Sequence, residues 1–214
     1  ITVTGVDDDI TAVDDTDTVV EGASISRKVN SEYDIDSDDV DLDESSSSRI
    51  TAIRIGNTEG SGDAGTLGRA LTGTYGQLTM RANGSYFYIA DQTAANALSV
   101  GETATDVFNY TVTSGSQTDT ALLTITITGE NDAVIAIDDT DAVDEDATIT
   151  RSVGDSQELD SDDTDDDTND TTTIVGIATG SGNSTVDGTV GSPLIGTYGT
   201  LTVNADGSYT YSAD

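Results

Sequence analysis

Apolar and polar residues alternate along two neighbouring segments of the chain. Residues 107–113 read VFNYTVT and residues 123–128 read LTITIT, so apolar side chains occupy every second position in both. A period of two places these side chains on one face of an extended strand, and Thr, Ile, Val and Tyr favour strands. Ser114-Gly115-Ser116 supplies a turn between the two segments. The pattern predicts a β-hairpin.

A second hairpin is predicted over residues 77–89. Asn83-Gly84 lies between two alternating runs and suits the positive φ angles of a tight hairpin turn, and Asp206-Gly207 recurs in the same context later in the chain. Further strands are expected near 18–29 and 49–56, and residues 94–101 are either a single helical turn or a loop. About seven short strands without a long helix predict an all-β fold, a two-sheet β-sandwich.

The sequence repeats itself over a long period. Residues 1–29 return as residues 125–153 with 16 of 29 positions identical, and residues 73–91 return as 196–214 with 13 of 19 identical. A period of this length is that of a self-sufficient domain rather than a solenoid unit. We therefore expect residues 1–5 to be the last strand of a preceding repeat, 6–131 a complete β-sandwich repeat, and 132–214 a truncated second repeat that lacks the counterpart of 92–124.

Composition limits the function classes. The chain has 41 acidic and 7 basic residues and a net charge of −34, which disfavours nucleic acid and anionic lipid and favours cations. With 34% hydrophobic residues we expect small cores and no membrane insertion. The absence of Cys and His removes disulfides, the usual zinc sites and the Ser-His-Asp type of catalysis.

Three segments carry a family resemblance: 97–115 (ALSVGETATDVFNYTVTSG), 120–133 (TALLTITITGENDA) and 196–211 (GTYGTLTVNADGSYTY). They resemble the VCBS repeat of giant, RTX-type bacterial surface adhesins. The resemblance implies tandem Ig-like or cadherin-like β-sandwich domains in an extracellular, cell-surface protein that is secreted, usually by the type I route, and that serves adhesion and biofilm formation. It implies no catalysis. The chain has Val134 where the family often has Pro.

The acidic residues are clustered. Of the 41 acids, 32 fall within residues 7–21, 32–44, 130–146 and 155–170. Carboxylates one residue apart on a loop can turn toward one calcium ion, which takes six to eight oxygen ligands, and such runs occur at 34–43 and 160–167. Solvated loops or a halophilic surface are the alternatives, but halophilic acids spread over every exposed face. We therefore predict Ca²⁺ as the bound cofactor.

The junction at residues 129–141 resembles the cadherin linker, in which an Asn-Asp pair joins acids of both neighbours around calcium. We expect Asn131, Asp132, Glu21 and one aspartate of 160–165 to meet there. The full set of candidate ligands is Asp8, Asp14, Asp15, Glu21, Asp36, Asp38, Asp39, Asp41, Asp43, Asn131, Asp132, Asp138, Asp139, Glu145, Asp160, Asp162, Asp163 and Asp165.

Three functions are compatible with these features. The first is a spacer in which calcium and neighbouring repeats of the same chain fix the angle between domains. The second is a repeat that itself binds a surface glycan or other copies of the chain; an exposed aromatic cluster in one loop would favour it, and the sequence shows none. The third, hydrolysis by paired carboxylates, fits poorly because catalytic acids are placed singly in a cleft.

Overall fold

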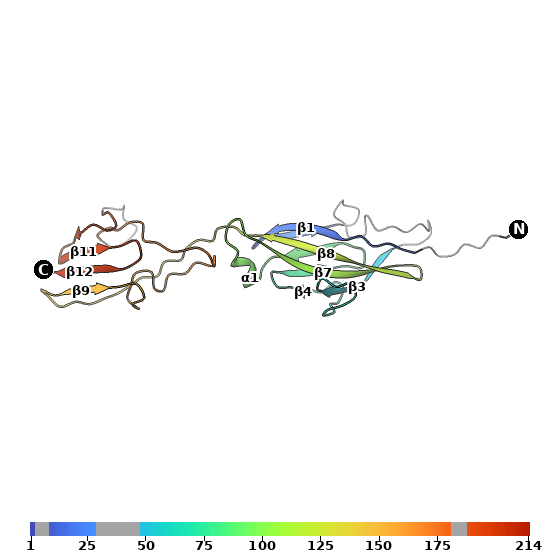
Figure 1. Cartoon of the computed structure of the whole chain (residues 1–214), viewed down its shortest axis with the longest axis horizontal. Coiled ribbons are helices and arrows are strands. Elements are labelled where there is room, and N and C mark those ends of the chain that lie inside the picture. The colour runs from blue at the N-terminus through green and yellow to red at the C-terminus, as the bar shows by residue number, and fades with distance from the viewer. Residues whose placement is uncertain (3–8, 29–47, 181–187) are drawn as a thin grey trace. The chain divides into compact units, whose positions relative to one another are not determined.

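The computed structural model describes residues 1–2, 9–28, 48–180 and 188–214, in which strands predominate. The chain divides into two compact units, Ile1–Asn131 and Asp132–Asp214 (Figure 1). The prediction of an all-β, sandwich-like fold is confirmed. Among the described residues, no helix is long and apolar enough to cross a membrane.

One sheet of the first unit is built on the predicted 107–128 hairpin. Its strands have the order β1-β8-β7-β3, with β7 and β8 paired antiparallel along their whole length and β1 parallel to β8 (Figure 1). The strands span Asp15–Val20 (β1), Arg49–Ile55 (β3), Thr103–Ser114 (β7) and Gln117–Thr128 (β8).

The other sheet of the first unit contains the predicted Asn-Gly hairpin. Its order is β2-β6-β5-β4, and all neighbours are antiparallel. The elements are Ser24–Arg27 (β2), Leu71–Thr72 (β4), Gln77–Met80 (β5), Tyr86–Ile89 (β6) and the short helix Thr93–Asn96 (α1). Of the segment 94–101, expected as a helical turn or a loop, residues 94–96 belong to this single helical turn and residues 97–101 are turns and irregular chain. The region expected as one strand near 18–29 is divided into β1 and β2 by a turn at Glu21-Gly22.

The alternating side chains of both sheets form the core of the first unit. Leu123, Ile125 and Ile127 are fully buried, as the period-two pattern requires. From the other sheet, the ring of Tyr88 meets Phe108 edge-on, with 6.3 Å between the ring centroids. Apolar burial of this kind is the main stabilising term of a small sandwich.

A buried aspartate fastens the two sheets together. Asp106 on β7 is 4% exposed, and its carboxylate accepts the backbone N–H groups of Thr74 (2.8 Å), Tyr75 (3.1 Å) and Gly76 (3.0 Å). It also accepts the Tyr88 hydroxyl at 2.7 Å. Four donors compensate for the loss of water around the charge, so Asp106 can be buried without a cation.

The second unit consists of one such sheet. Strands Thr148–Arg151 (β9), Leu194–Ile195 (β10), Gly199–Val203 (β11) and Tyr209–Ala213 (β12) pair in the order β10-β11-β12-β9. By the repeat alignment these strands correspond to β2, β4, β5 and β6. Residues 139–144, the counterpart of β1, join no sheet in the part of the chain that is described.

We expect Asp106→Asn to lower the free energy of unfolding of the first unit by about 2 kcal/mol, because an amide cannot replace a carboxylate that accepts four hydrogen bonds. Urea unfolding followed by circular dichroism measures the change. Asp91→Asn is the control, since Asp91 is exposed and the substitution removes the same charge. Equal stability of the two variants would contradict the anchoring role of Asp106.

Candidate metal site

Two acidic stretches of the second unit are brought together by one antiparallel bridge. The Ile135 N–H donates to the Thr164 carbonyl at 2.8 Å, and the Thr164 N–H donates to the Ile135 carbonyl at 3.0 Å. This register carries residues 132–139 past residues 160–167 in opposite directions, so that 132 lies across from 167 and 139 across from 160. The bridge thus forms two carboxylate clusters, one on each side of it.

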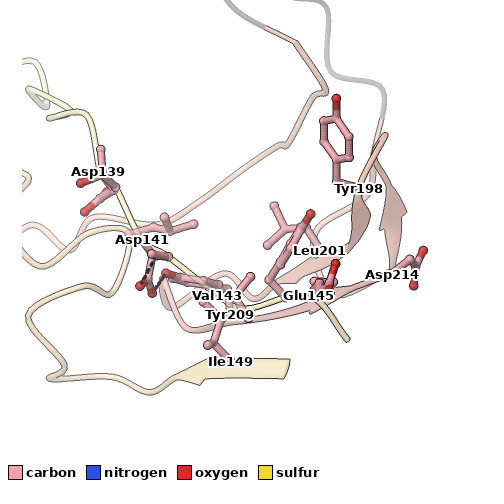
Figure 2. Close-up of a pocket in the computed structure, with 14 residues that line it drawn as sticks. Asp139, Asp141, Val143, Glu145, Ile149, Tyr198, Leu201, Tyr209 and Asp214 are labelled. Atoms are coloured by element: carbon pink, nitrogen blue, oxygen red, sulfur yellow. Dashed lines mark hydrogen bonds between the residues drawn. The ribbon is translucent and has the colours of Figure 1, made fainter. Parts of the chain in front are cut away.

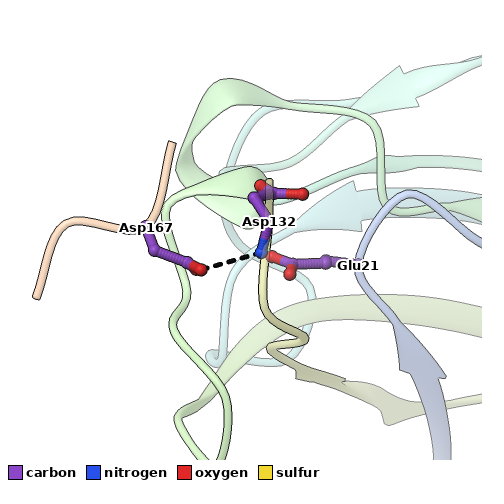
Figure 3. A group of neighbouring side chains, drawn as sticks. All are labelled: Glu21, Asp132 and Asp167. Carbon is purple, nitrogen blue, oxygen red and sulfur yellow. Dashed lines mark hydrogen bonds between the residues drawn. The ribbon is translucent and has the colours of Figure 1, made fainter. Parts of the chain in front are cut away.

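The first, the Asp132 cluster, comprises Asp132, Asp165, Asp166 and Asp167. The Asp132 N–H donates to Asp167 Oδ2 at 2.8 Å (Figure 3), and the Asp167 N–H donates to Asp165 Oδ1 at 3.0 Å. Burial raises the pKa of Asp132, and the negative charges of Asp167, Asp166 and Asp165 raise it further. The charges are therefore close enough to oppose one another.

Asp167 is the member of this cluster whose burial is least compensated by hydrogen bonds. Its residue is 2% exposed, and its Oδ1 has no hydrogen-bond partner among the described residues. A buried carboxylate oxygen without a donor costs on the order of 1 to 3 kcal/mol, and more when it is charged. A proton or a bound cation removes that cost.

The second, the Asp139 cluster, comprises Asp138, Asp139, Asp160, Asp162 and Asp163. Asp163 Oδ1 accepts the Ile137 N–H at 2.8 Å, which holds the two stretches together on this side of the bridge. Burial raises the pKa of Asp139, and the negative charges of Asp162, Asp163, Asp138 and Asp160 raise it further. All five members were among the predicted ligands, Asp160, Asp162 and Asp163 from their spacing and Asp138 and Asp139 from the likeness of the 129–141 junction to the cadherin linker.

Two residues that were not among the candidate ligands belong to the same region. Asp167 ends the predicted acidic run 160–167 and lies two residues beyond its last candidate ligand, Asp165. Glu158 is buried, and its pKa is raised chiefly by a hydrogen bond with the Asp160 carboxyl. Gly207 packs over this pair, because a Cβ there would lie 2.4 Å from Asp160 Oδ1. The period-two spacing of Glu158, Asp160 and Asp162 was the signal that could have included Glu158.

The predicted ligands of the first unit contact its strands. Asp14 Oδ1 accepts the Leu122 N–H at 2.9 Å, and Asp15 Oδ2 accepts the Tyr110 hydroxyl at 2.8 Å. Both carboxylates thereby fasten the start of β1 to the β7–β8 hairpin. Neither contact requires a cation.

Glu21 lies at the end of β1 and contacts the final residues of the first unit. Its Oε1 accepts the Glu130 N–H at 2.7 Å. Asn131 is exposed and is the last residue of that unit. Glu21 therefore positions the backbone immediately before Asn131.

The remaining predicted ligands lie elsewhere. Glu145 lies in a turn before β9 and faces a hollow on the open side of the second sheet. Six others lie outside the described residues: Asp8, Asp36, Asp38, Asp39, Asp41 and Asp43.

The ligand atoms that both clusters offer suit a hard divalent cation. Their side chains offer only carboxylate oxygens, which calcium and magnesium prefer, and the region is built from loops that can adapt to a large coordination number. The unsatisfied Oδ1 of Asp167 gives the Asp132 cluster an oxygen that a cation would complete. The residues present therefore fit calcium.

Comparisons with known proteins identify no family. No family model matches the chain, and no curated protein matches it. Among solved structures, the chain is similar to an NMR structure of a protein from Bacteroides thetaiotaomicron, at 14% identity over 56% of this chain and 89% of that one, with a TM-score of 0.26. The strands and their pairing therefore define the fold.

In EGTA, we expect the 135–164 bridge to be more stable at acidic than at neutral pH. The pKa values of Asp132 and Asp139 are raised in the folded chain, so these two carboxyl groups bind protons more tightly in the folded than in the unfolded state. The resulting stabilisation is complete below the unfolded pKa and is lost as the pH rises through the folded pKa values. The pH range over which this stabilisation is lost begins near the unfolded pKa of about 3.9. Protection factors of the Ile135 and Thr164 amides, measured by hydrogen exchange between pH 4 and 7, report it.

Asp132→Asn removes one of the opposed charges at neutral pH, so it should raise these protection factors at pH 7 and flatten their pH dependence. Asp91→Asn should change neither. Protection that is greatest at pH 7 in EGTA would show that the clustered charges do not oppose one another.

Proposed function

We propose that the chain is a non-catalytic, extracellular repeat module of a large bacterial adhesin, a spacer stiffened by calcium that extends a distal adhesive domain for cell adhesion or biofilm formation. The observation that carries the proposal is the buried Asp167 oxygen without a hydrogen-bond partner in the described residues, beside the carboxylates of Asp132 and Asp165.

Calcium accounts for this arrangement better than protonation does. Each cluster contains at least four carboxyl groups, and a protein in a neutral medium would have to keep several of them protonated against their ordinary pKa values. A single divalent cation neutralises two charges and supplies the missing contact to Asp167 Oδ1. Sites of extracellular modules bind calcium at about 10⁻⁴ to 10⁻³ M, which suits a surface protein.

The location of the Asp132 cluster explains how calcium would stiffen the array. Glu21 holds the backbone of Glu130 on the first unit, and Asp167 holds the backbone of Asp132 on the second. Only Asn131 separates these two restrained residues along the chain. A cation in the Asp132 cluster thus fixes the second unit's backbone next to the boundary, and a site filled at ~100 times its dissociation constant adds ~2.7 kcal/mol.

Loss of calcium would have the opposite effect. Two unit charges ~4 Å apart repel by ~4 kcal/mol at an effective dielectric near 20, so the empty clusters weaken the bridge that forms them. The spacer would be slack where calcium is scarce, as in a cell before type I secretion, and stiff at the cell surface.

Calcium titration of the full chain, followed by ¹⁵N NMR, tests the site. Calcium should shift the amide signals of Asp132, Ile135, Thr164 and Asp167 in a saturable way, with half-saturation at about 10⁻⁴ to 10⁻³ M. Asp167→Asn should weaken binding at this cluster by at least tenfold, whereas Asp91→Asn should leave it unchanged. Absence of these shifts in the wild-type chain, or an equal loss of them in Asp167→Asn and Asp91→Asn, would overturn the calcium site.

Small-angle X-ray scattering of the same samples tests the spacer role. Calcium should increase the maximum dimension and reduce flexibility of the wild-type chain and of Asp91→Asn, but not of Asp167→Asn. Calcium binding without any change in the scattering curve would retain the site and overturn its role as a stiffener.

A further inference from the structure

The outer face of the β2-β6-β5-β4 sheet in the first unit carries positive charge, although the chain as a whole is strongly acidic. Alternate side chains of β2, β5 and β6 point away from the core, because the intervening ones, such as Leu78, Tyr86 and Tyr88, are buried. The nine outward positions of these strands and their immediate extensions include two cations and no acid: Ser24, Ser26, Lys28, Gln77, Thr79, Arg81, Ser85, Phe87 and Ile89.

The two cations lie on opposite sides of β6. Arg27 pairs with Tyr86, so the next residue, Lys28, lies beside Ser85. On the other side, the Arg81 N–H donates to the Ser85 carbonyl at 2.9 Å. Neighbouring strands are ~4.8 Å apart, which places the backbones of Lys28 and Arg81 ~10 Å from each other. One small side chain therefore separates two positive ones.

An exposed aromatic ring lies next to this row. Phe87 follows Ser85 by two residues on the same face and is 40% exposed. It is paired with Ser26 of β2 and Thr79 of β5, and diagonal neighbours on a sheet face are within reach of aromatic and long side chains. The other aromatic residues in the described part of the first unit are buried or half-buried. Phe87 thus presents an apolar ring between hydroxyl groups and beside two cations.

The fold does not use these cations in ion pairs. Arg27 pairs with Asp17 in the interior of the unit. Lys28 and Arg81 are exposed, and neither has a carboxylate within ion-pairing distance in the described part of the chain. Two positive charges are thus available to a ligand in a protein that has 41 acidic residues.

The second unit preserves the framework of this sheet. The Tyr209 hydroxyl donates to Asp141 at 2.7 Å (Figure 2), as the Tyr86 hydroxyl donates to Asp17 at 2.8 Å. The two sheets also have equivalent strands in the same order. The repeat alignment therefore identifies the counterpart of each outward position.

The outward positions of the second sheet are neutral and polar. Hydroxyl pairs join its strands, Thr148 with Ser212 at 2.9 Å and Thr150 with Thr210 at 3.2 Å, and such cross-strand pairs stabilise a sheet. A hydroxyl-lined face is therefore sufficient for this framework. The nine counterparts are Thr148, Thr150, Ser152, Thr200, Thr202, Asn204, Ser208, Thr210 and Ser212.

The first unit departs from this pattern at three neighbouring positions. Phe87, Lys28 and Arg81 stand where the second unit has threonine, serine and asparagine. Single exposed apolar residues are common on protein surfaces. An exposed ring between unpaired cations is the composition of a binding surface instead, because aromatic residues and Arg are enriched where partners dock.

The surroundings of Phe87 favour a sugar over a peptide. Backbone groups of β6 are paired with β2 on one side and with β5 on the other, so a peptide finds no free strand to extend at this ring. A sugar ring has an apolar face that can stack on Phe87, and its hydroxyls can bond with those of Ser26 and Thr79. The cations select a sugar that carries a carboxylate.

The net charge of −34 limits the length of such a ligand. At physiological ionic strength charges are screened beyond ~8 Å, so a short acidic unit responds mainly to the nearby cations. A long and densely charged polymer such as nucleic acid extends past them onto acidic surface and is repelled.

We propose that this face of the first unit binds an acidic carbohydrate of the uronic acid class. One sugar ring stacks on Phe87, and carboxylates on that sugar and its neighbours pair with Arg81 and Lys28. The binding does not depend on calcium. Repeats that share one framework then differ in ligand binding, since the second unit has the same sheet without the ring and the cations.

A titration of the ¹⁵N-labelled full chain with trigalacturonic acid tests the proposal. EGTA is present so that calcium cannot bridge carboxylates of sugar and protein, and the salt concentration is about 0.15 M, close to physiological ionic strength. We expect saturable shifts of the Ser26, Thr79 and Phe87 amides and no shift of the Thr150 and Thr210 amides. The methyl ester of the same trisaccharide keeps the rings but has no charge, and it should bind at least about threefold more weakly.

Variants separate the ring from the charge. Arg81→Gln should weaken binding about threefold, and Phe87→Thr, which introduces the second unit's residue, about fivefold. Arg54→Gln removes the same charge from β3 in the other sheet and should leave the affinity unchanged. Absence of the shifts, equal shifts with triglutamate peptide or with the methyl ester, or equal affinities of Arg81→Gln and Arg54→Gln would overturn the carbohydrate site.

Discussion

The cost of burying negative charge is the constraint on which this structure depends. A chain with 41 acidic and 7 basic residues cannot pair most of its carboxylates with cationic side chains, so its buried carboxylates also depend on neutral hydrogen-bond donors. Asp17 illustrates the available solution. Burial alone would raise its pKa, but hydrogen bonds from Arg27, Tyr86 and the Thr18 N–H outweigh burial and hold the pKa below its usual value. Asp106 is buried with four neutral donors instead, three backbone N–H groups and the Tyr88 hydroxyl.

The strands of the first unit were predictable because their information is local. Alternation in residues 107–113 and 123–128, with Ser114-Gly115-Ser116 between them, determines a hairpin whose apolar face has to be buried. The division of the 18–29 region into two strands was not predictable in this way. Glu21-Gly22 interrupts the run only because β1 and β2 belong to different sheets, which is a property of the tertiary fold.

The composition of the candidate site was partly predictable for a related reason. Spacing selected Asp160, Asp162 and Asp163, because carboxylates close in sequence can be close in space, and the likeness of the 129–141 junction to the cadherin linker selected Asp138 and Asp139. Asp167 lies in the predicted run 160–167 but was not among the candidate ligands, since its importance comes from the pairing of Ile135 with Thr164 and no local pattern specifies that register. For Asp14 and Asp15, the same acidic spacing coincides with contacts to β7 and β8.

The carboxylates therefore fall into two physical classes with different responses to the medium. Asp17 and Asp106 receive their hydrogen bonds from protein groups. These bonds replace the water that each carboxylate loses on burial, so the contacts that hold the first unit's sheets together need no bound ion. Asp167 retains an oxygen without a donor in the described chain, and its neighbours repel it. On the proposed function, calcium would then act on the backbone beside the boundary while the sandwich stays folded without it. Separating the two classes would let an array of repeats change its stiffness without unfolding its domains.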